Sequence, residues 1–345
     1  MPVTGWYRSE GFQNPFFILI KIFLRASWLQ KGHSQFLSFS KRTYAVALML
    51  IRDIAMRKTT LLRTLIHAPE ILVIPVVHDP LCARIAEQAG IKAVFSAGYA
   101  NSAAYLGKPD VSLMSLSEMV SCASRIVDAV TIPVFADGDT GYGNVTNVIR
   151  TIEQYEKAGV AGIFIEDQVF PKRCGHMDEK RVIPEREMVA KIRAAVATRK
   201  DPDLVIMART DAIAIEGIDE AIQRANRYHD AGADLLFVEA PESVEQMRRI
   251  CAEVKGPVFA NNLPGGKSPY LPAKELEDIG YAVVADATSC TYVIAKAVRE
   301  LFTEISGSGS SAGLTDRMIL FDEFNRLVGL QEIREAEKFY YSGME

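Results

Sequence analysis

The sequence predicts a (β/α)₈ barrel of the TIM type, and three features of the chain support that prediction. Apolar runs of strand length alternate with segments of helical periodicity about eight times between residues 60 and 305. The connections are short and glycine closes several helical segments, which favours parallel strands joined by helices. Polar residues recur where the apolar runs end, a pattern typical of the carboxyl edge of a barrel. An open doubly wound sheet is the alternative, but no glycine-rich dinucleotide turn follows the first strand.

The expected strands are short, apolar and mostly rich in β-branched residues. In chain order they are 72–77, 92–97, 131–136, 160–165, 204–208, 235–238, 257–260 and 281–285. The segments around them carry apolar residues at helical spacing. Helices are expected at 61–66, 80–90, 117–130, 144–158, 184–198, 220–231, 244–254, 273–279 and 292–305, and a loop at 98–110.

Composition limits the class of protein. The 345 residues are 49% hydrophobic and 24% charged with a net charge of −4, as in a globular chain that can bury a core. No basic stripe with interleaved aromatic residues is present, so nucleic-acid binding is not expected. The five cysteines are scattered and no pair has CxxC spacing, so neither a disulfide framework nor a zinc site is predicted. A reducing, cytoplasmic location is expected.

Residues 1–55 differ from the rest of the chain. They carry a net charge of +5, and the remainder carries −9. Their apolar runs, 16–24 and 45–51, are shorter than the roughly 18–20 residues of a membrane-spanning helix. Three interpretations stay open: an organelle-targeting segment, a peripheral membrane or partner-binding extension, or an upstream translation before a true start at Met56. The last is favoured because the globular pattern begins directly after Met56, and the catalytic domain is expected at 56–306.

The C-terminal segment, 307–345, is expected to lie outside the barrel. It opens with GSGSSAG, which predicts a flexible linker, and continues with two amphipathic helices at 316–328 and 331–341. Two short helices cannot bury their apolar faces alone. We therefore expect this segment to pack on a partner subunit.

A loop with a thiol among cations follows the fourth expected strand. That strand ends at Glu166, and Lys172-Arg173-Cys174-Gly175-His176 comes shortly afterwards. Neighbouring cations are expected to lower the pKa of the Cys174 thiol and to make it available for proton transfer. The alternative is an idle loop cysteine within a solvated basic patch.

Six polar residues stand at or just beyond the ends of expected strands and should converge on one face of the barrel. They are Asp137, Asp139, Glu166, Arg209, Glu239 and Asn261. Any one of them alone could be a helix cap or a surface charge, but six in register favour a site. Three of them, Asp137, Asp139 and Glu166, are carboxylates that would repel one another unless a cation lay between them. Ligands that are all oxygen atoms favour Mg²⁺ or Mn²⁺ over zinc. Arg209 can form a bidentate pair with a substrate carboxylate.

Several motifs show a resemblance to a known family. The strings DGDTGYGN, GIFIEDQVFPKRCGHM, VIMARTDA and LLFVEAPES resemble the isocitrate lyase/phosphoenolpyruvate mutase superfamily over about residues 60–340. Within it, SAGYANSAAYLGKPD, ANNLPGGKSP and FDEFNRLVGLQEI are similar to the branch of petal death protein, 2,3-dimethylmalate lyase and oxaloacetate hydrolase. Ala97 stands where the family usually has Ser, and Pro264 where related Gly-Gly-Lys loops have Glu.

The resemblance implies a barrel with a swapped C-terminal helix and a homotetramer, a dimer of helix-swapped dimers. It implies Mg²⁺ held partly through water by Asp137, Asp139 and Glu166. Residues 172–176 match a mobile gating loop in which the cysteine is the catalytic acid of the lyases, whereas phosphonate-forming mutases carry a Lys-Thr-Asn-type loop. The residues implied to bind or assist substrate are Gly98 and Tyr99 through their amides, Arg209 and Asn261, with Asp110, His176 and Glu239 in support.

We therefore expect a Mg²⁺-dependent carbon–carbon lyase, with Mn²⁺ as a substitute ion. Its expected substrate is a 2-hydroxy dicarboxylate of the substituted-malate type, cleaved to a 2-oxo acid such as pyruvate and a carboxylate. Lys172, Arg173 and His176 would stabilise the charge that develops, and Cys174 would protonate carbon. The alternatives are an oxaloacetate hydrolase and then a methylisocitrate lyase. A phosphonomutase and a non-catalytic binding protein with a membrane handle are the least favoured.

Overall fold

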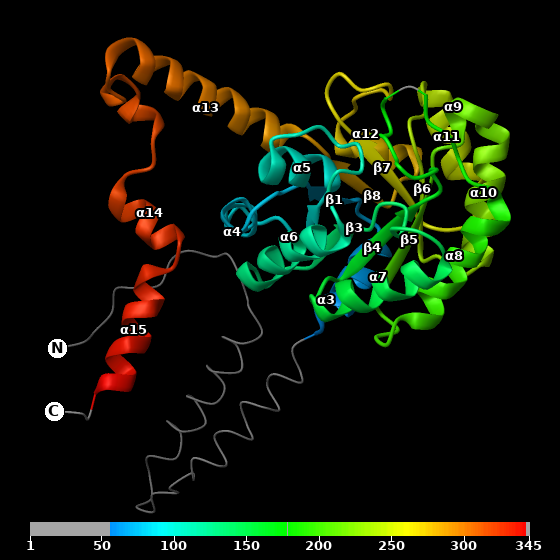
Figure 1. Cartoon of the computed structure of the whole chain (residues 1–345), viewed down its shortest axis with the longest axis horizontal. Helices are drawn as coiled ribbons and strands as arrows, with labels where there is room; N and C mark the ends of the chain where they lie inside the picture. The colour runs from blue at the N-terminus through cyan, green and yellow to red at the C-terminus, as the bar shows by residue number, and fades with distance from the viewer. Residues whose placement is uncertain (1–55, 178, 343–345) are drawn as a thin grey trace, which may run out of the picture. The chain divides into compact units, whose positions relative to one another are not determined.

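Eight parallel strands form one sheet in the order β1-β8-β7-β6-β5-β4-β3-β2. The computed structural model describes residues 56–177 and 179–342, so the expectations for 1–55 lie outside the described residues. A parallel bridge between Val76 and Phe95 connects the chain after β1 to β2 and closes the barrel. Figure 1 shows the strands inside a ring of helices, which confirms the (β/α)₈ prediction. The strands are β1 (Leu72–Pro75), β2 (Val94–Ser96), β3 (Val134–Asp137), β4 (Gly162–Glu166), β5 (Val205–Thr210), β6 (Leu235–Val238), β7 (Val258–Asn262) and β8 (Val283–Asp286).

The helices of the barrel also lie close to their predicted positions. They are α3 (Lys58–Ile66), α4 (Pro80–Gln88), α5 (Gly98–Leu106), α6 (Leu116–Ala129), α7 (Val145–Lys157), α8 (Glu185–Thr198), α9 (Ile213–Glu216), α10 (Ile218–Asp230), α11 (Val244–Glu253) and α12 (Ala273–Ile279). Two of them were not expected, the short α9 and the nine-residue α5, which replaces the loop predicted at 98–110.

Helix α5 forms without a strong apolar stripe. Its sequence, GYANSAAYL, consists mostly of small residues, of which Ala100, Asn101 and Ser102 are buried. Gly107 ends the helix in a left-handed conformation with φ 63°, which glycine adopts at little cost. The loop prediction was therefore wrong, because tertiary burial compensates for the weak periodicity.

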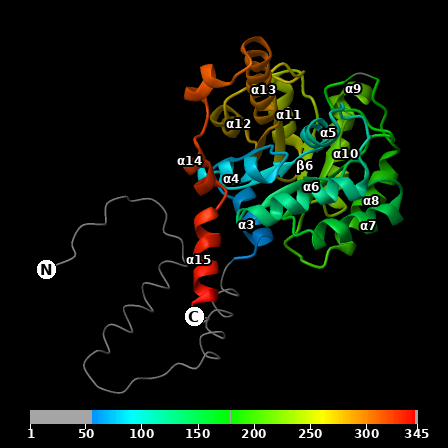
Figure 2. The same ribbon diagram turned by 60° about the vertical axis from the view of Figure 1, so that its left-hand side comes forward.

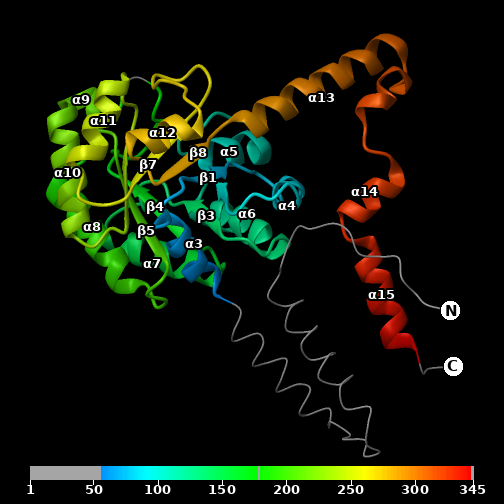
Figure 3. The same cartoon turned by 180° about the vertical axis from the view of Figure 1, so that it is seen from behind.

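The core has two layers. Inside the barrel, edge-to-face aromatic pairs join Phe95 to Phe135, Phe164 and Phe259. Between the strands and the outer helices lies a larger aliphatic layer. Helix α3 contributes Leu62 and Ile66 to the inner layer. Figure 3 shows this helix, in blue, next to the strands of the barrel. The inner layer fills the barrel below its carboxyl edge and leaves that edge to polar side chains.

The C-terminal helices have no buried residue. They are α13 (Ser289–Ser308), α14 (Phe321–Leu327) and α15 (Leu330–Tyr341), with a 3₁₀ helix, η1, at Ala312–Arg317. Helix α13 extends into the predicted linker and ends at Gly309 in a left-handed conformation with φ 76°. The prediction of a flexible linker was therefore wrong at its first residues and again at η1. Residues of α4 and α14 line a shared groove. Figure 2 shows the ribbons of these two helices next to each other.

No helix among the described residues is long and apolar enough to cross a membrane.

Candidate active site

A cavity of about 80 Å³ lies at the carboxyl edge of the barrel. Its apolar wall is formed by four phenylalanines of the inner core, Phe95, Phe164, Phe237 and Phe259. Eight of the predicted site residues line it, which are Tyr99, Asp110, Asp137, Lys172, Cys174, His176, Arg209 and Asn261. The other predicted residues, Gly98, Asp139, Glu166, Arg173 and Glu239, are not part of this lining. Strand ends and the loop after β4 therefore meet at one cavity.

The three predicted metal ligands are buried and are held by the backbone. Asp137 accepts hydrogen bonds from the amides of Gly98 and Asp139, each at 2.8 Å. Asp139 lies in the left-handed region with φ 48°, a conformation that aspartate tolerates better than most residues. Both carboxylate oxygens of Glu166 lack a hydrogen bond although the residue is fully buried, and its Oε2 lies 3.4 Å from the Nε of Arg209. An unsatisfied buried carboxylate is costly, so the site can accommodate a cation.

Burial also disturbs the protonation of these acids. It raises the pKa of Asp139 to about 7, against the opposing effect of Lys172. Burial likewise raises the pKa of Glu166 well above its usual value, although Arg209 and Lys172 oppose the shift. A divalent ion would reverse both effects, because it stabilises the charged forms. An oxygen-only set of this kind suits an ion such as Mg²⁺, which is held by a few carboxylates and keeps several waters.

Lys172 provides the positive charge at the centre of the acids. Its ammonium lies 2.8 Å from Asp110 Oδ2 and 2.9 Å from Asp139 Oδ1. The side chain is only 3% exposed, and the surrounding acids raise its pKa although burial alone would lower it. Lys172 is therefore a fixed cation in the cavity wall rather than a base.

The thiol of Cys174 borders the cavity, but its pKa differs from the expectation. Burial raises the pKa of Cys174 above its usual value, and Asp110 and Glu239 add to the increase. The expected lowering by cations was wrong, because Lys172 pairs with two acids and Arg173 turns toward Glu179, 2.6 Å away. The thiol therefore stays protonated at neutral pH, as a proton donor must.

His176 joins the loop after β4 to two other strand ends. Its Nε2 lies 2.9 Å from Glu239 Oε1, and its Nδ1 accepts a hydrogen bond from the backbone amide of Lys267 at 3.0 Å. The Lys267 amide occupies Nδ1, so Nε2 is the nitrogen that faces Glu239. His176 therefore links the loop after β4 to two other loops, and its expected role in stabilising charge stays a prediction.

Arg209 is oriented by residues that sequence reasoning did not select. Asp211 holds the guanidinium through two contacts of 2.9 and 3.1 Å, and Arg209 lies over the Phe237 ring at 4.9 Å. Lys180 donates to Asp211 Oδ1 at 2.8 Å and also to the carbonyl of Gly175. Although burial opposes it, these two cations hold the pKa of Asp211 below its ordinary range. The RTD string after β5 was a signal for Asp211, whereas nothing local marked Lys180.

Helix α5 contributes its amino end to the cavity. Two backbone amides were predicted to bind a substrate carboxylate, those of Gly98 and Tyr99. The Gly98 amide donates to Asp137, whereas the Tyr99 amide makes no hydrogen bond to that carboxylate. A Cβ at residue 98 would lie 2.8 Å from Asp137 Oδ2, so only glycine permits this approach. Ala97, the residue that departs from the family pattern, is part of the lining.

Two lining residues from the end of the barrel were also missed. Thr288 and Tyr292 follow β8 and face the cavity, and the Tyr292 hydroxyl lies 3.3 Å from that of Tyr99. The sequence offered no signal for them, because the final helix was expected to begin only at Tyr292.

The fold and the site together define the class, an enzyme on a (β/α)₈ barrel with buried acids and a thiol-bearing loop at its carboxyl edge. The profile of the phosphoenolpyruvate phosphomutase family matches residues 62–306. The chain belongs to this family, within the phosphoenolpyruvate mutase/isocitrate lyase superfamily, as the resemblance predicted.

Two curated relatives cover most of the chain. The 2,3-dimethylmalate lyase of Eubacterium barkeri is 47% identical over 82% of this chain and 98% of its own length. The petal death protein of Dianthus caryophyllus is 41% identical over 81% of this chain and 88% of its own length.

Solved structures give the same picture. A 2,3-dimethylmalate lyase matches with a TM-score of 0.78 and 32% identity over 83% of this chain and 98% of that one. An oxaloacetate acetylhydrolase in complex with 3,3-difluorooxalacetate matches with a TM-score of 0.77 and 34% identity, over 83% and 97%. A phosphonopyruvate hydrolase in complex with oxalate and Mg²⁺ matches with a TM-score of 0.76 and 31% identity, over 83% and 99%.

Proposed function

We propose that this chain is a Mg²⁺-dependent carbon–carbon lyase that cleaves a substituted malate, such as 2,3-dimethylmalate, into a 2-oxo acid and a carboxylate. One observation carries the proposal: a protonated thiol, Cys174, borders the same cavity as the anion-binding groups Arg209 and Lys172. The 47% identity to a 2,3-dimethylmalate lyase supports the choice of substrate class.

Asp137, Asp139 and Glu166 would hold the ion, since all three are buried acids and burial raises the pKa of Asp139 and Glu166. Bound Mg²⁺ would supply a Lewis acid that lowers the pKa of the C2 hydroxyl of the substrate and orients it. Arg209 and Asn261, with the Tyr99 amide, would bind carboxylate groups of the substrate.

The C2 hydroxyl would lose its proton to solvent, the C2 carbonyl would form and the C2–C3 bond would break. The electron pair of that bond moves into the second carboxylate as an enolate. The fixed charge of Lys172 and the donors of Arg209 would stabilise this dianion. Cys174 would then donate its thiol proton to C3, and the resulting thiolate would be reprotonated before the next turnover.

The loop that carries Cys174 would control access of water. Three contacts hold it over the cavity, through Lys172 to Asp110, His176 to Glu239 and Lys180 to Asp211. Opening of the loop would admit substrate, and closing would bring the thiol to carbon. Arg173 lies at 46% exposure beside Glu179 and would join the site only if the loop rearranged.

A pyruvate-release assay tests the proposal on substituted malates, methylisocitrate and oxaloacetate, with Mg²⁺ and with EDTA. We expect Mg²⁺-dependent pyruvate release from a substituted malate, and near-complete loss of turnover in Cys174→Ser with oxalate binding retained. Cys122→Ser, a half-buried cysteine on α6, is the matched control. Undiminished cleavage by Cys174→Ser would contradict the role of the thiol.

Oxaloacetate hydrolysis to oxalate and acetate is the second candidate, favoured by the structural similarity to an oxaloacetate acetylhydrolase. Oxalate formed from oxaloacetate, without pyruvate from any malate, would select it over the lyase. Release of pyruvate from methylisocitrate alone would select a methylisocitrate lyase instead.

We also propose that the enzyme works as a homotetramer in which C-terminal helices are exchanged between subunits. The absence of buried residues in α13, α14 and α15 supports this assembly. The cytoplasmic location, the division into 1–55, 56–306 and 307–345, and the three interpretations of 1–55 stay predictions.

A further inference from the structure

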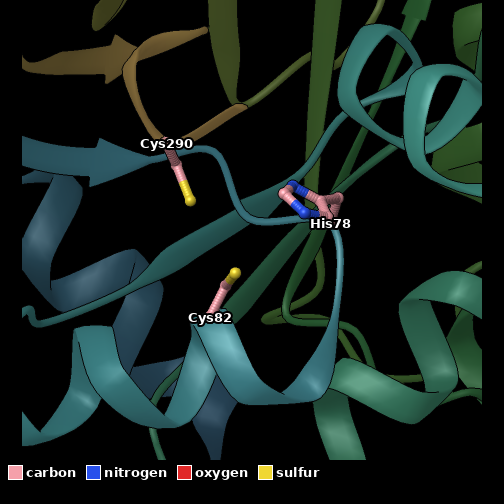
Figure 4. Close-up of side chains that lie close together, drawn as sticks. All are labelled: His78, Cys82 and Cys290. Carbon is pink, nitrogen blue, oxygen red and sulfur yellow. The ribbon is translucent and has the colours of Figure 1, made fainter. Parts of the chain in front are cut away.

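A second cluster of chemically active side chains lies outside the substrate cavity. His78 follows β1, Cys82 is in the first turn of α4, and Cys290 is in the first turn of α13. One ligand atom from each, a ring nitrogen and two sulfurs, lies within 4.8 Å of the other two. Figure 4 shows the two sulfurs pointing toward one another, with the His78 ring beside them. The cluster is separate from the acidic residues assigned to Mg²⁺.

The imidazole of His78 has one nitrogen free for a ligand. The side chain is 9% exposed, and its Nδ1 is buried without a hydrogen-bond partner. Its Nε2 lies 3.5 Å from Asp79 Oδ2, which places a carboxylate on the opposite ring nitrogen. A carboxylate behind a histidine is the usual arrangement that orients a histidine on a metal. An unsatisfied buried nitrogen with such support indicates a missing partner.

The two thiols face each other. The sulfurs of Cys82 and Cys290 lie within 4.8 Å of one another and of a ring nitrogen of His78. The Cys82 amide donates to Asp79 Oδ1 at 2.7 Å, so the same aspartate fixes the start of α4. A cation that replaced the two thiol protons would bind both sulfurs.

We propose that His78, Cys82 and Cys290 form a structural zinc site. Two thiolates and one imidazole are the ligands that Zn²⁺ selects, and oxygen-preferring ions such as Mg²⁺ disfavour them. Two sulfurs on one zinc lie roughly 3.8 Å apart, given Zn–S bonds of about 2.3 Å, so small rotamer changes would complete the site. A water is the fourth ligand, because the Asp79 carboxylate lies beside the opposite nitrogen of the His78 ring. Binding replaces two thiol protons, which leave to solvent, and no electron is transferred.

The zinc would anchor the first turn of α13. No residue of that helix is buried, and Tyr292, two residues after Cys290, lines the substrate cavity. The ion would join the ends of β1 and β8 through α4 and α13, and would thereby hold Tyr292 against Tyr99. The site is independent of the reaction proposed above. Sequence spacing gave no indication of it, because Cys290 follows the last strand of the barrel and His78 follows the first.

Metal analysis of the full-length protein, purified under nitrogen and gel-filtered, tests the proposal. We expect one zinc per chain, and loss of at least about tenfold in zinc affinity in Cys82→Ser, Cys290→Ser and His78→Phe. Asp79→Asn should weaken binding roughly 10–100-fold, as loss of an orienting carboxylate does. Cys122→Ser is the control and should keep its zinc. Circular dichroism of each variant shows whether it is folded.

Cobalt substitution distinguishes the thiolate ligands from the acidic site. Co²⁺ bound by Cys82 and Cys290 produces a sulfur-to-metal charge-transfer band in the near ultraviolet, whereas Co²⁺ on carboxylates does not. We expect this band in the wild type and in Cys174→Ser, and its loss in Cys82→Ser. Equal zinc content in wild type and Cys82→Ser, absence of the band, or a Cys82–Cys290 disulfide in the nitrogen-purified protein would overturn the proposal.

Discussion

Burial sets the protonation state of the thiol in the cavity. A proton donor is active only in its protonated form, so its activity is present below its pKa and is lost as pH rises through that value. Burial is the largest cause that raises the pKa of Cys174 above 9.0, followed by the acids Asp110 and Glu239. The environment of one residue therefore allows a cysteine to act as an acid at neutral pH.

We expect the descending limb of the pH profile of kcat to lie above pH 9.0, where an ordinary thiol would already be ionised. Steady-state kinetics with saturating Mg²⁺ and substrate measure it. A descending limb well below pH 9.0 that disappears in Cys174→Ser would show that the site lowers the pKa of the Cys174 thiol instead of raising it.

Lys180 positions the loop and Arg209 without contacting the cavity. Its ammonium is 2% exposed and pairs with Asp211 at 2.8 Å. Lys180→Met leaves Asp211 with Arg209 as its only strong partner, so we expect a loss of about 3 kcal/mol in the free energy of unfolding. We also expect a lower kcat and faster proteolysis of the loop at 172–180.

Denaturant unfolding, kinetics and limited proteolysis measure these effects. Lys200→Met, at an exposed position, is the control. If proteolysis cleaves the loop at 172–180 no faster in Lys180→Met than in the wild type, Lys180 does not hold this loop in place.

At the scale of the element, one short backbone contact fixes the position of the start of α5. The Gly98 amide donates to Asp137 at 2.8 Å, and the helix then directs its amino end at the cavity. Periodicity did not predict this helix, because its side chains are small and its stability comes from burial of Ala100, Asn101 and Ser102.

Gly98→Ala should weaken the site and the fold together, because the new Cβ would displace the Asp137 carboxylate. We expect a loss of about 1–3 kcal/mol in unfolding free energy and weaker Mg²⁺ binding by calorimetry. Gly307→Ala, in α13 with open space around it, is the matched control and should be neutral. Unchanged Mg²⁺ affinity in Gly98→Ala would argue against Asp137 as a ligand.

At the scale of the whole molecule, the C-terminal helices carry an apolar surface that the described chain does not cover. Leu320, Phe321, Ile333 and Phe339 are each more than half exposed, Phe321 at 81%. Such a surface is typical of a region that packs on another subunit.

Truncation after Ser308 should reduce the assembly to a smaller species, because it removes η1, α14 and α15 with their apolar residues. Light scattering coupled to gel filtration measures the mass of the full chain and of the truncated one. Equal subunit numbers in both would show that these helices do not hold the assembly together.

The sequence by itself determined the barrel, the order of its elements and the face on which the site is built. Apolar periodicity and strand-end polarity depend on local spacing, which the chain shows directly. The resemblance in four motifs added the family, and the comparisons confirm it. Residues such as Asp137, Arg209 and Cys174 could be selected because each lies at a strand end or in a distinctive loop.

Only the tertiary structure decided which groups touch and in what state of charge. The contact of Lys180 with Asp211, the contacts of His176 with Glu239 and Lys267, and the raised pKa of Cys174 all depend on burial and on partners distant in sequence. The same holds for His78 and Cys290, which come together because β1 pairs with β8. Desolvation and contact across a closed barrel act through space, and linear spacing does not record them.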